Sequence, residues 1–379
     1  MVHGLLRRLA RTDWMMFMIA VALLTVGLVM VYSSSYHFQL MGWADVTSPT
    51  YHVMKQMRFA ALGLGFLVVG WIVDYHLYRR FAVPILIATL AILSIMAFVG
   101  RWVAMTQAGG VIVYGSVQPV EAAKIGAIIY IAVWLESRRE QLKQFSMGTA
   151  PFMLILGSVA GLIMAQRDLS TAVLLAATAT VMFFVAGANM KHFALYLIFG
   201  ALMVAIPIFV FGYGHDRYQI WVEGPYSDPT AKGYQILHSL RALSLGGFSG
   251  VGLGQSGQKM FLGRFSHTDF IFAIIAEEFG FLGSVAVIGL YALWVWRGFT
   301  IARNAPDMYG RLLAIGLVCW TAFQATLSIA VATNSVPVTG TVLPFMSYGG
   351  SSLVSALGAV GILLNISRSG QQVKSGGVR

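Results

Sequence analysis

The fold is decided by long apolar stretches such as residues 269–296, which read DFIFAIIAEEFGFLGSVAVIGLYALWVW. An α-helix rises about 1.5 Å per residue, so this stretch is long enough to cross a hydrocarbon core of about 30 Å. Further apolar runs lie at about 13–33, 57–73, 82–99, 117–135, 151–166, 170–187, 192–212, 311–333 and 342–366. The runs are continuous and lack the period-two alternation of barrel strands. The sequence therefore predicts an all-α polytopic membrane protein, a bundle of about ten transmembrane helices.

Composition supports this class and excludes others. Hydrophobic residues make up 58% of the chain and charged residues only 10%, which is too apolar for a soluble domain to cover its surface. The formal net charge is +11, but no basic cluster is interleaved with aromatic residues as in a nucleic-acid module. We therefore expect contact with membrane lipid and no nucleic-acid partner. The single cysteine, Cys319, excludes a disulfide within the chain.

The distribution of basic residues predicts the orientation. Arg7, Arg8 and Arg11 precede the first apolar run, and no convincing cleavage site follows it. Outside one long loop, most Lys and Arg residues fall on the same side as this N-terminal group. Because cytoplasmic loops are enriched in Lys and Arg, we expect both termini in the cytoplasm.

The chain is expected to form one domain, residues 1–379, with a single long extracytoplasmic loop at about 213–268. Within the loop, Ile236, Leu237, Leu240 and Leu243 follow helical spacing, which predicts an amphipathic helix on the outer membrane surface. Glycine then dominates residues 246–257, where the backbone can turn sharply or approach another group closely.

The segment that joins this loop to residues 269–296 is the first candidate site. His267, Thr268 and Asp269 stand at the expected membrane boundary, with Glu277 and Glu278 farther along the apolar run. Charged groups at membrane depth are costly and indicate function. Asp269 also fits a helix-start carboxylate that the helix dipole stabilises. On one continuous helix, Glu277 lies about a quarter turn from the face of Asp269 and Glu278 nearly opposite.

Polar residues also open two other expected helices. Glu121 and Lys124 are three positions apart and share a face, which suits a structural ion pair and a role in chemistry about equally. Asp168 is interpreted as the N-cap of the helix expected at 170–187.

The region before the last expected span, residues 334–352, combines two prolines, paired glycines and several hydroxyls, among them Ser347, Ser351 and Ser352. Irregular backbone at membrane depth is tolerated where it is buried or lines a cavity. Helix packing through small residues is the alternative. The density of polar groups favours a cavity wall.

Several of these motifs resemble those of one known family, in the right order and over nearly the whole chain. They are residues 27–35, Gln118-Pro119-x-Glu121-x-x-Lys124, Asp168-x-x-Thr171, Asp228-Pro229, Gly233-Tyr234-Gln235, Gly252-x-Gly254, His267 to Phe270 with Glu277-Glu278, and Pro344 to Ser352. The family is that of the SEDS proteins (shape, elongation, division and sporulation), which includes FtsW, RodA and SpoVE. The first-span string and the residues before the tenth span look closer to the division branch than to the elongation branch. Val120, Arg167 and Ser170 depart from the family pattern.

The resemblance implies a peptidoglycan glycosyltransferase that polymerises lipid II at the outer face of the bacterial cytoplasmic membrane, with undecaprenyl pyrophosphate as leaving group. It implies a class B penicillin-binding protein and other divisome proteins as partners, and a place at the division septum. Asp269 matches the family's catalytic carboxylate. Such a residue suits the general base of inverting glycosyl transfer.

Substrate contacts are expected from polar residues around Asp269 and at the outer helix ends. These are Glu121, Lys124, Lys259, Arg264, His267, Thr268, Glu277, Ser347, Ser351 and Ser352. Arg217 is a further cation on this side that suits the leaving pyrophosphate. No ligand spacing for a divalent cation such as Mg²⁺ or Mn²⁺ is present, and the cofactor is left open.

Two other functions fit parts of the pattern. A lipid II flippase or transporter would use the charged residues within the spans, but the chain lacks clear inverted repeats. A scaffold that only activates its partner would not need Asp269. An elongation-type polymerase is the alternative within the family.

Overall fold

The computed structural model describes residues 12–38, 48–106, 118–228 and 232–376. Each of the ten expected spans coincides with a helix in these ranges. They are α2 (Trp14–Ser35), α3 (Tyr51–Ile72), α5 (Ala82–Thr106), α6 (Pro119–Ser137), α7 (Ala150–Ala165), α8 (Leu169–Val185), α9 (Phe193–Ala205), α13 (Ile271–Arg303), α14 (Met308–Ala332) and α15 (Gly350–Gly376). Seven of the helices in the described ranges are long and apolar enough to cross a membrane, and Ala82–Phe98 and Leu169–Val185 are shorter apolar helices. The all-helical membrane fold is confirmed.

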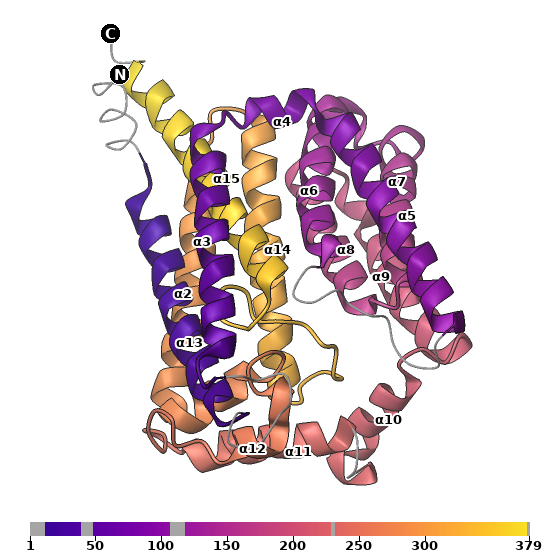
Figure 1. Ribbon diagram of the computed structural model, residues 1–379. Helices are drawn as coiled ribbons and strands as arrows, with labels where there is room; N and C mark the ends of the chain where they lie inside the picture. Colours follow the sequence, from indigo (N-terminus) through magenta and orange to yellow (C-terminus); the bar gives the residue numbers. More distant parts are fainter. Residues whose placement is uncertain (1–11, 39–47, 107–117, 229–231, 377–379) are drawn as a thin grey trace.

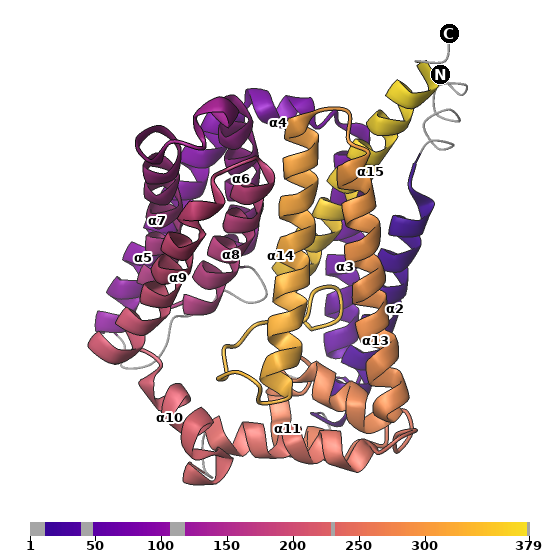
Figure 2. The same cartoon turned by 180° about the vertical axis from the view of Figure 1, so that it is seen from behind.

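The helices form two groups that meet along α14. On one side stand α2, α3, α13 and α15, and on the other α5 to α9 (Figures 1 and 2). Helix α14 packs against α13 and α15 of the first group and against α6 and α8 of the second. Trp294 of α13 is fully buried and its ring lies 5.2 Å from that of Phe345, in the segment between α14 and α15. The hydrophobic core therefore continues up to the irregular segment that precedes α15.

The expected long loop is largely helical. It contains α10 (His215–Glu223), α11 (Lys232–Gly246) and the short α12 (Gln258–Leu262), with 3₁₀ turns at Pro225–Ser227 and Gly263–Phe265. These elements lie together across the end of the bundle opposite the termini (Figures 1 and 2). The predicted amphipathic helix falls within α11 and is confirmed as a helix. Its contact with the membrane surface stays a prediction.

The expected span over 269–296 is present as α13, but its helix is interrupted. Helix α13 begins at Ile271, and Gly280 interrupts it with a φ of 65° and a ψ of −159°. The interruption frees carbonyl groups before Gly280 and N–H groups after it. The glycine-rich loop after α11 satisfies them. Val251 N–H donates to Glu277 O at 2.9 Å, and Phe281 N–H donates to Gly247 O at 2.9 Å.

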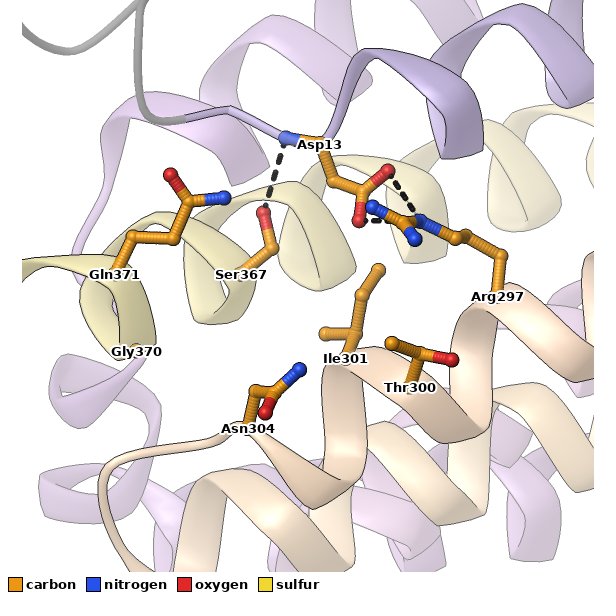
Figure 3. A pocket seen from close by; sticks show the side chains of 8 residues that line it. All are labelled: Asp13, Arg297, Thr300, Ile301, Asn304, Ser367, Gly370 and Gln371. Carbon is orange, nitrogen blue, oxygen red and sulfur yellow. Dashed lines mark hydrogen bonds and ion pairs between the residues drawn. The ribbon is translucent and has the colours of Figure 1, made fainter. Parts of the chain in front are cut away.

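The end of the bundle that carries the termini is held by an ion pair. Asp13 caps α2 by accepting from Met16 N–H. Nε of Arg297 lies 2.9 Å from Oδ1 and 2.8 Å from Oδ2 of Asp13 (Figure 3). The backbone N–H of Asp13 also donates to the Ser367 hydroxyl at 3.3 Å. A cavity of about 170 Å³ adjoins these side chains. It lies far from the predicted site, because it is lined by the start of α2 and the last turns of α13 and α15.

Candidate functional site

Asp269 lies between the 3₁₀ turn Gly263–Phe265 and the start of α13, half-buried at the end of the bundle opposite the termini. Among the described residues no side chain or backbone group makes a hydrogen bond or ion pair with its carboxylate. Burial raises the pKa of Asp269 to about 6, and the positive charge of Arg217 opposes that rise. An unpaired carboxylate with such a pKa is suited to take up a proton near neutral pH.

One side of Asp269 is formed by residues 338–341, which we call the strap. A Cβ atom at Gly340 would lie 3.7 Å from Oδ2 of Asp269, so the strap backbone runs beside the carboxylate. Two other helices hold the strap by its carbonyl groups. Arg217 of α10 donates to Val338 O at 3.3 Å, and the Ser170 hydroxyl at the start of α8 donates to Thr339 O at 3.2 Å.

The chain on the other side of Asp269 is tied to the turn before α15. Ser347 donates from its hydroxyl to Thr268 O at 2.6 Å and accepts from Leu343 N–H at 2.8 Å. Tyr348 N–H donates to His267 O at 2.8 Å. The structure thus brings the predicted residues His267, Thr268 and Ser347 together, and it does so mainly through backbone groups that hold Asp269 in place.

His267 itself is buried, and its ring packs 4.7 Å from that of His52 and 5.1 Å from that of Tyr348. Burial and the neighbouring histidines His52 and His37 lower the pKa of His267 well below its usual value. The imidazole is therefore neutral at pH 7. A neutral ring packed among aromatic side chains supports the fold around Asp269 and adds no positive charge to it.

Glu121 and Lys124 form the ion pair that their spacing predicted. Lys124 Nζ lies 2.8 Å from Oε1 of Glu121 and 3.0 Å from Oε1 of Gln324, and all three side chains are buried. Gln324 in turn donates to Val342 O at 3.1 Å, directly after the strap. Oε2 of Glu121 is buried with no hydrogen-bond partner among the described residues. The pair therefore supports the strap region and leaves one carboxylate oxygen available.

The hydroxyls at the start of α15 adjoin the same region. Ser351 accepts from Gln118 N–H at 2.6 Å, which links α15 to the residue before α6. Ser352 is buried in the first turn of α15. The segment 338–351 thus contacts α6, α8, α10 and the residues around Asp269. The irregular backbone that the prolines and glycines predicted is confirmed.

Three other predicted site residues make no contact with Asp269 among the described residues. Lys259 is fully buried, with Nζ 2.7 Å from Gly254 O and 3.3 Å from Oε1 of Glu278. Glu277 accepts from Gly257 N–H at 2.9 Å and from the Ser256 hydroxyl, so it caps the start of α12. Arg264 is exposed. Lys259 and Glu277 are occupied by contacts within the protein, and a substrate contact from any of the three stays a prediction.

Asp168 caps α8 as predicted, since its carboxylate accepts from Thr171 N–H at 3.0 Å. The sequence interpretation missed Gln324, and it included Gly340 only as part of the irregular segment. Gln324 had a signal, because it is a polar residue inside an apolar run, where such side chains indicate function or pairing. Gly340 had no signal of its own in the sequence, because its position beside Asp269 arises only when the strap is folded.

No group of His, Cys, Asp and Glu side chains in the described ranges is arranged to hold a metal ion. Asp269 has no second carboxylate beside it, and Glu277 and Glu278 are engaged elsewhere. Within the described ranges, these residues do not form a divalent-cation site.

Taken together, these observations define a polytopic membrane protein with a candidate site at one end of the bundle. At the end opposite the termini, an unpaired carboxylate lies beside an irregular segment. Residues 13–372 match the family model described as cell cycle protein, FtsW/RodA/SpoVE. The chain belongs to this family.

Individual relatives support the assignment over nearly the full length. The chain is 38% identical to a probable peptidoglycan glycosyltransferase FtsW of Trichlorobacter lovleyi, over 95% of this chain and 94% of the relative. It is 37% identical to the stage V sporulation protein E of Bacillus subtilis, over 94% and 97%.

Solved structures share the fold. One solved chain is described under structural coordination of polymerization and crosslinking by a peptidoglycan synthase complex. It superposes with a TM-score of 0.76 at 29% identity, and the match covers 95% of this chain and 99% of that chain. The rod shape determining protein RodA of Thermus thermophilus superposes with a TM-score of 0.67 at 26% identity, covering 94% and 97%.

Proposed function

We propose that this chain polymerises lipid II into glycan strands at the outer face of the cytoplasmic membrane, with Asp269 as the general base. The chain is a peptidoglycan glycosyltransferase of the FtsW type, as its family and its relatives indicate. One observation carries the assignment of the base. The Asp269 carboxylate is unpaired within the described residues, half-buried, and has its pKa raised to about 6.

The chemistry needs few groups. Asp269 takes the proton from a hydroxyl of the acceptor sugar as that oxygen bonds to the anomeric carbon of the donor. The bond between the anomeric carbon and the pyrophosphate oxygen breaks, and undecaprenyl pyrophosphate leaves with the electron pair. Arg217 is the cation whose charge acts on Asp269, so it is also placed to compensate the departing phosphate charge. The strap limits the space on the Gly340 side of the carboxylate.

The polyprenyl tail needs an apolar surface within the membrane. A groove of about 360 Å³ lies between α3, α5, α6 and α15, with Phe66, Ile92, Ile129 and Ile362 among its lining residues. The helix α6 that forms one wall begins with the Glu121–Lys124 pair, so the groove and the polar region share an element. We assign this groove to the first isoprene units of lipid II.

The relatives support a proposal for the partner and the location. One similar solved chain belongs to a peptidoglycan synthase complex that couples polymerization and crosslinking. We assign a class B penicillin-binding protein as the crosslinking partner of this chain, together with other divisome proteins at the septum. The excess of basic residues on the side of the termini supports a cytoplasmic location for both.

The assignment of Asp269 is tested by Asp269→Asn in purified protein supplied with lipid II and a class B penicillin-binding protein. The polymer should disappear while the protein remains folded and monodisperse. Glu223→Gln, an exposed carboxamide substitution on α10, is the matched control and should polymerise normally. Full polymerisation by Asp269→Asn rules out the base. Translocation of labelled lipid II in vesicles without polymer formation by the wild-type chain supports the flippase instead.

A further inference from the structure

The glycine-rich loop between α11 and α12, residues 246–254, has an unusual surface for a segment outside the spans. Its large side chains are exposed, with Phe248 at 69%, Leu253 at 52% and Val251 at 43% of their full area. No charged residue occurs between Arg241 and Lys259, and Lys259 is buried in an ion pair. An exposed apolar patch without charges marks a surface that contacts a membrane or another protein.

Several backbone polar groups of the 246–254 loop are hydrogen-bonded within the protein. Its N–H groups at Val251 and Gly252 donate to the carbonyls of Glu277 and Glu278 at 2.9 and 3.0 Å, and its carbonyl at Phe248 accepts from Leu282 N–H at 3.2 Å. These bonds satisfy both the loop and the two ends of the broken helix α13. Backbone polar groups at membrane depth must be paired within the protein, because hydrocarbon offers no partner.

Two glycines make this pairing possible. A Cβ atom at Gly280 would lie 2.3 Å from Gly250 N, and one at Gly250 would lie 2.2 Å from Glu278 O. Both residues also have positive φ angles, 65° and 81°. The loop and the break in α13 are therefore one structural unit.

The patch is continuous with the outward face of a membrane-spanning helix. The Phe248 ring stacks on that of Phe281 at 6.1 Å, and Phe281 is 60% exposed on α13. Exposed side chains then follow at Val285, Ile288 and Trp296, the spacing of one helix face. In both views of the bundle the turn after α11 lies beside this end of α13 (Figures 1 and 2).

The length of α13 places Phe281 within the hydrocarbon. No charged residue occurs from residue 281 to residue 296, and Arg297 follows. At 1.5 Å per residue this uncharged segment is about 24 Å long, shorter than a hydrocarbon core of about 30 Å. With Arg297 and its partner Asp13 at one boundary, Phe281 and the stacked Phe248 lie inside the other boundary.

We propose that the 246–254 loop is inserted in the outer leaflet, where Phe248, Val251 and Leu253 contact lipid hydrocarbon. The loop fixes the depth of the outer end of the molecule, because it is bonded to the break in α13, the helix that begins two residues after Asp269. The proposal does not depend on the reaction that the chain catalyses. It assigns lipid, rather than a second protein, to this surface.

The chain's single cysteine makes a direct test practical. In a Cys319→Ala background, nitroxide labels are attached at Phe248→Cys and, separately, at Leu253→Cys, and the purified chain alone is placed in lipid nanodiscs. Phe281→Cys is the lipid-facing reference. Tyr226→Cys is the aqueous reference, since Tyr226 is 74% exposed in the turn between α10 and α11.

Labels at positions 248 and 253 should behave like the label at 281, with frequent collisions with oxygen and several-fold fewer collisions with a water-soluble nickel chelate than at 226. Behaviour like that at 226 overturns the proposal. Exposure to the chelate in the isolated chain, followed by protection when a class B penicillin-binding protein is added, also overturns it and assigns the surface to that partner. The two positions serve as independent tests, so one misfolded variant leaves the other decisive.

Discussion

The carboxylate of Asp269 lies against Gly340, with 3.7 Å between Oδ2 and the place where a Cβ atom would stand. The two residues come from segments far apart in sequence. The strap that contains Gly340 is held by Arg217 and Ser170, and the chain that contains Asp269 is held by Ser347. The space beside the Asp269 carboxylate is therefore set by the strap.

A side chain at Gly340 should lower activity more than stability. Gly340 has a φ of 78°, so Gly340→Ala costs about 1 kcal/mol through backbone strain. Gly214→Ala is the matched control, because Gly214 has the same φ of 78° and no atom near its missing Cβ. Both variants should show similar losses in thermal unfolding, whereas only Gly340→Ala should polymerise lipid II slowly. Equal polymerisation rates for the two variants contradict the role of the strap.

Polymerisation should fail at acid pH. Burial raises the pKa of Asp269 to about 6, and the base must be ionised, so the initial rate should fall as the pH decreases through about 6. The sign for stability is opposite. A carboxyl group with a raised pKa in the folded state stabilises the fold when protonated, and this contribution is lost as the pH rises from about 4 to about 6. Asp269→Asn should therefore be at least as stable as the wild type at pH 7. A rate that is constant from pH 5 to pH 8 contradicts the assignment of the base.

Arg217 should shift this pH dependence. Its positive charge lowers the pKa of Asp269 against the effect of burial, so Arg217→Met should move the acid limb of the rate profile to higher pH. Arg217→Lys keeps the charge and should restore the limb in part. Arg241→Met, which removes an exposed cation on α11, should leave the limb in place. A lower rate with an unmoved limb would show that Arg217 acts only by holding the strap.

The sequence was sufficient for the spans, and it singled out Asp269 as the candidate carboxylate. Apolar runs identify helices because the hydrocarbon core demands both length and internal hydrogen bonding, and these demands are local. The pair Glu121–Lys124 was predictable for the same reason, since helical spacing alone brings the two side chains together. The irregular segment before α15 was predictable from its prolines and paired glycines.

The arrangement around Asp269 was beyond such local rules. The partner of Lys259 depends on how α12 packs against α13, because that packing brings Lys259 to Glu278. The pattern of apolar residues does not predict this packing. The break at Gly280 lies inside a continuous apolar run and therefore leaves no pattern in the sequence. The backbone groups that the break frees are hydrogen-bonded by a loop about thirty positions earlier in the chain. The contact of Gly340 with Asp269 likewise exists only in the folded chain.

The buried pair of Lys259 and Glu278 should be essential for stability. Lys259 Nζ lies 3.3 Å from Oε1 of Glu278, and the Glu278 carboxylate also accepts from the Ser33 hydroxyl at 2.7 Å. Lys259→Met leaves a buried carboxylate without its cation, which costs about 3–5 kcal/mol of the free energy of unfolding. Adding Glu278→Gln removes the uncompensated charge and should recover part of that loss, whereas the exposed Lys143→Met should stay within about 0.5 kcal/mol of the wild type. Denaturant unfolding in detergent measures all four proteins. A double variant less stable than Lys259→Met would show that the two side chains do not compensate each other, and the loop that carries Lys259 would then be held on α13 by its backbone bonds alone.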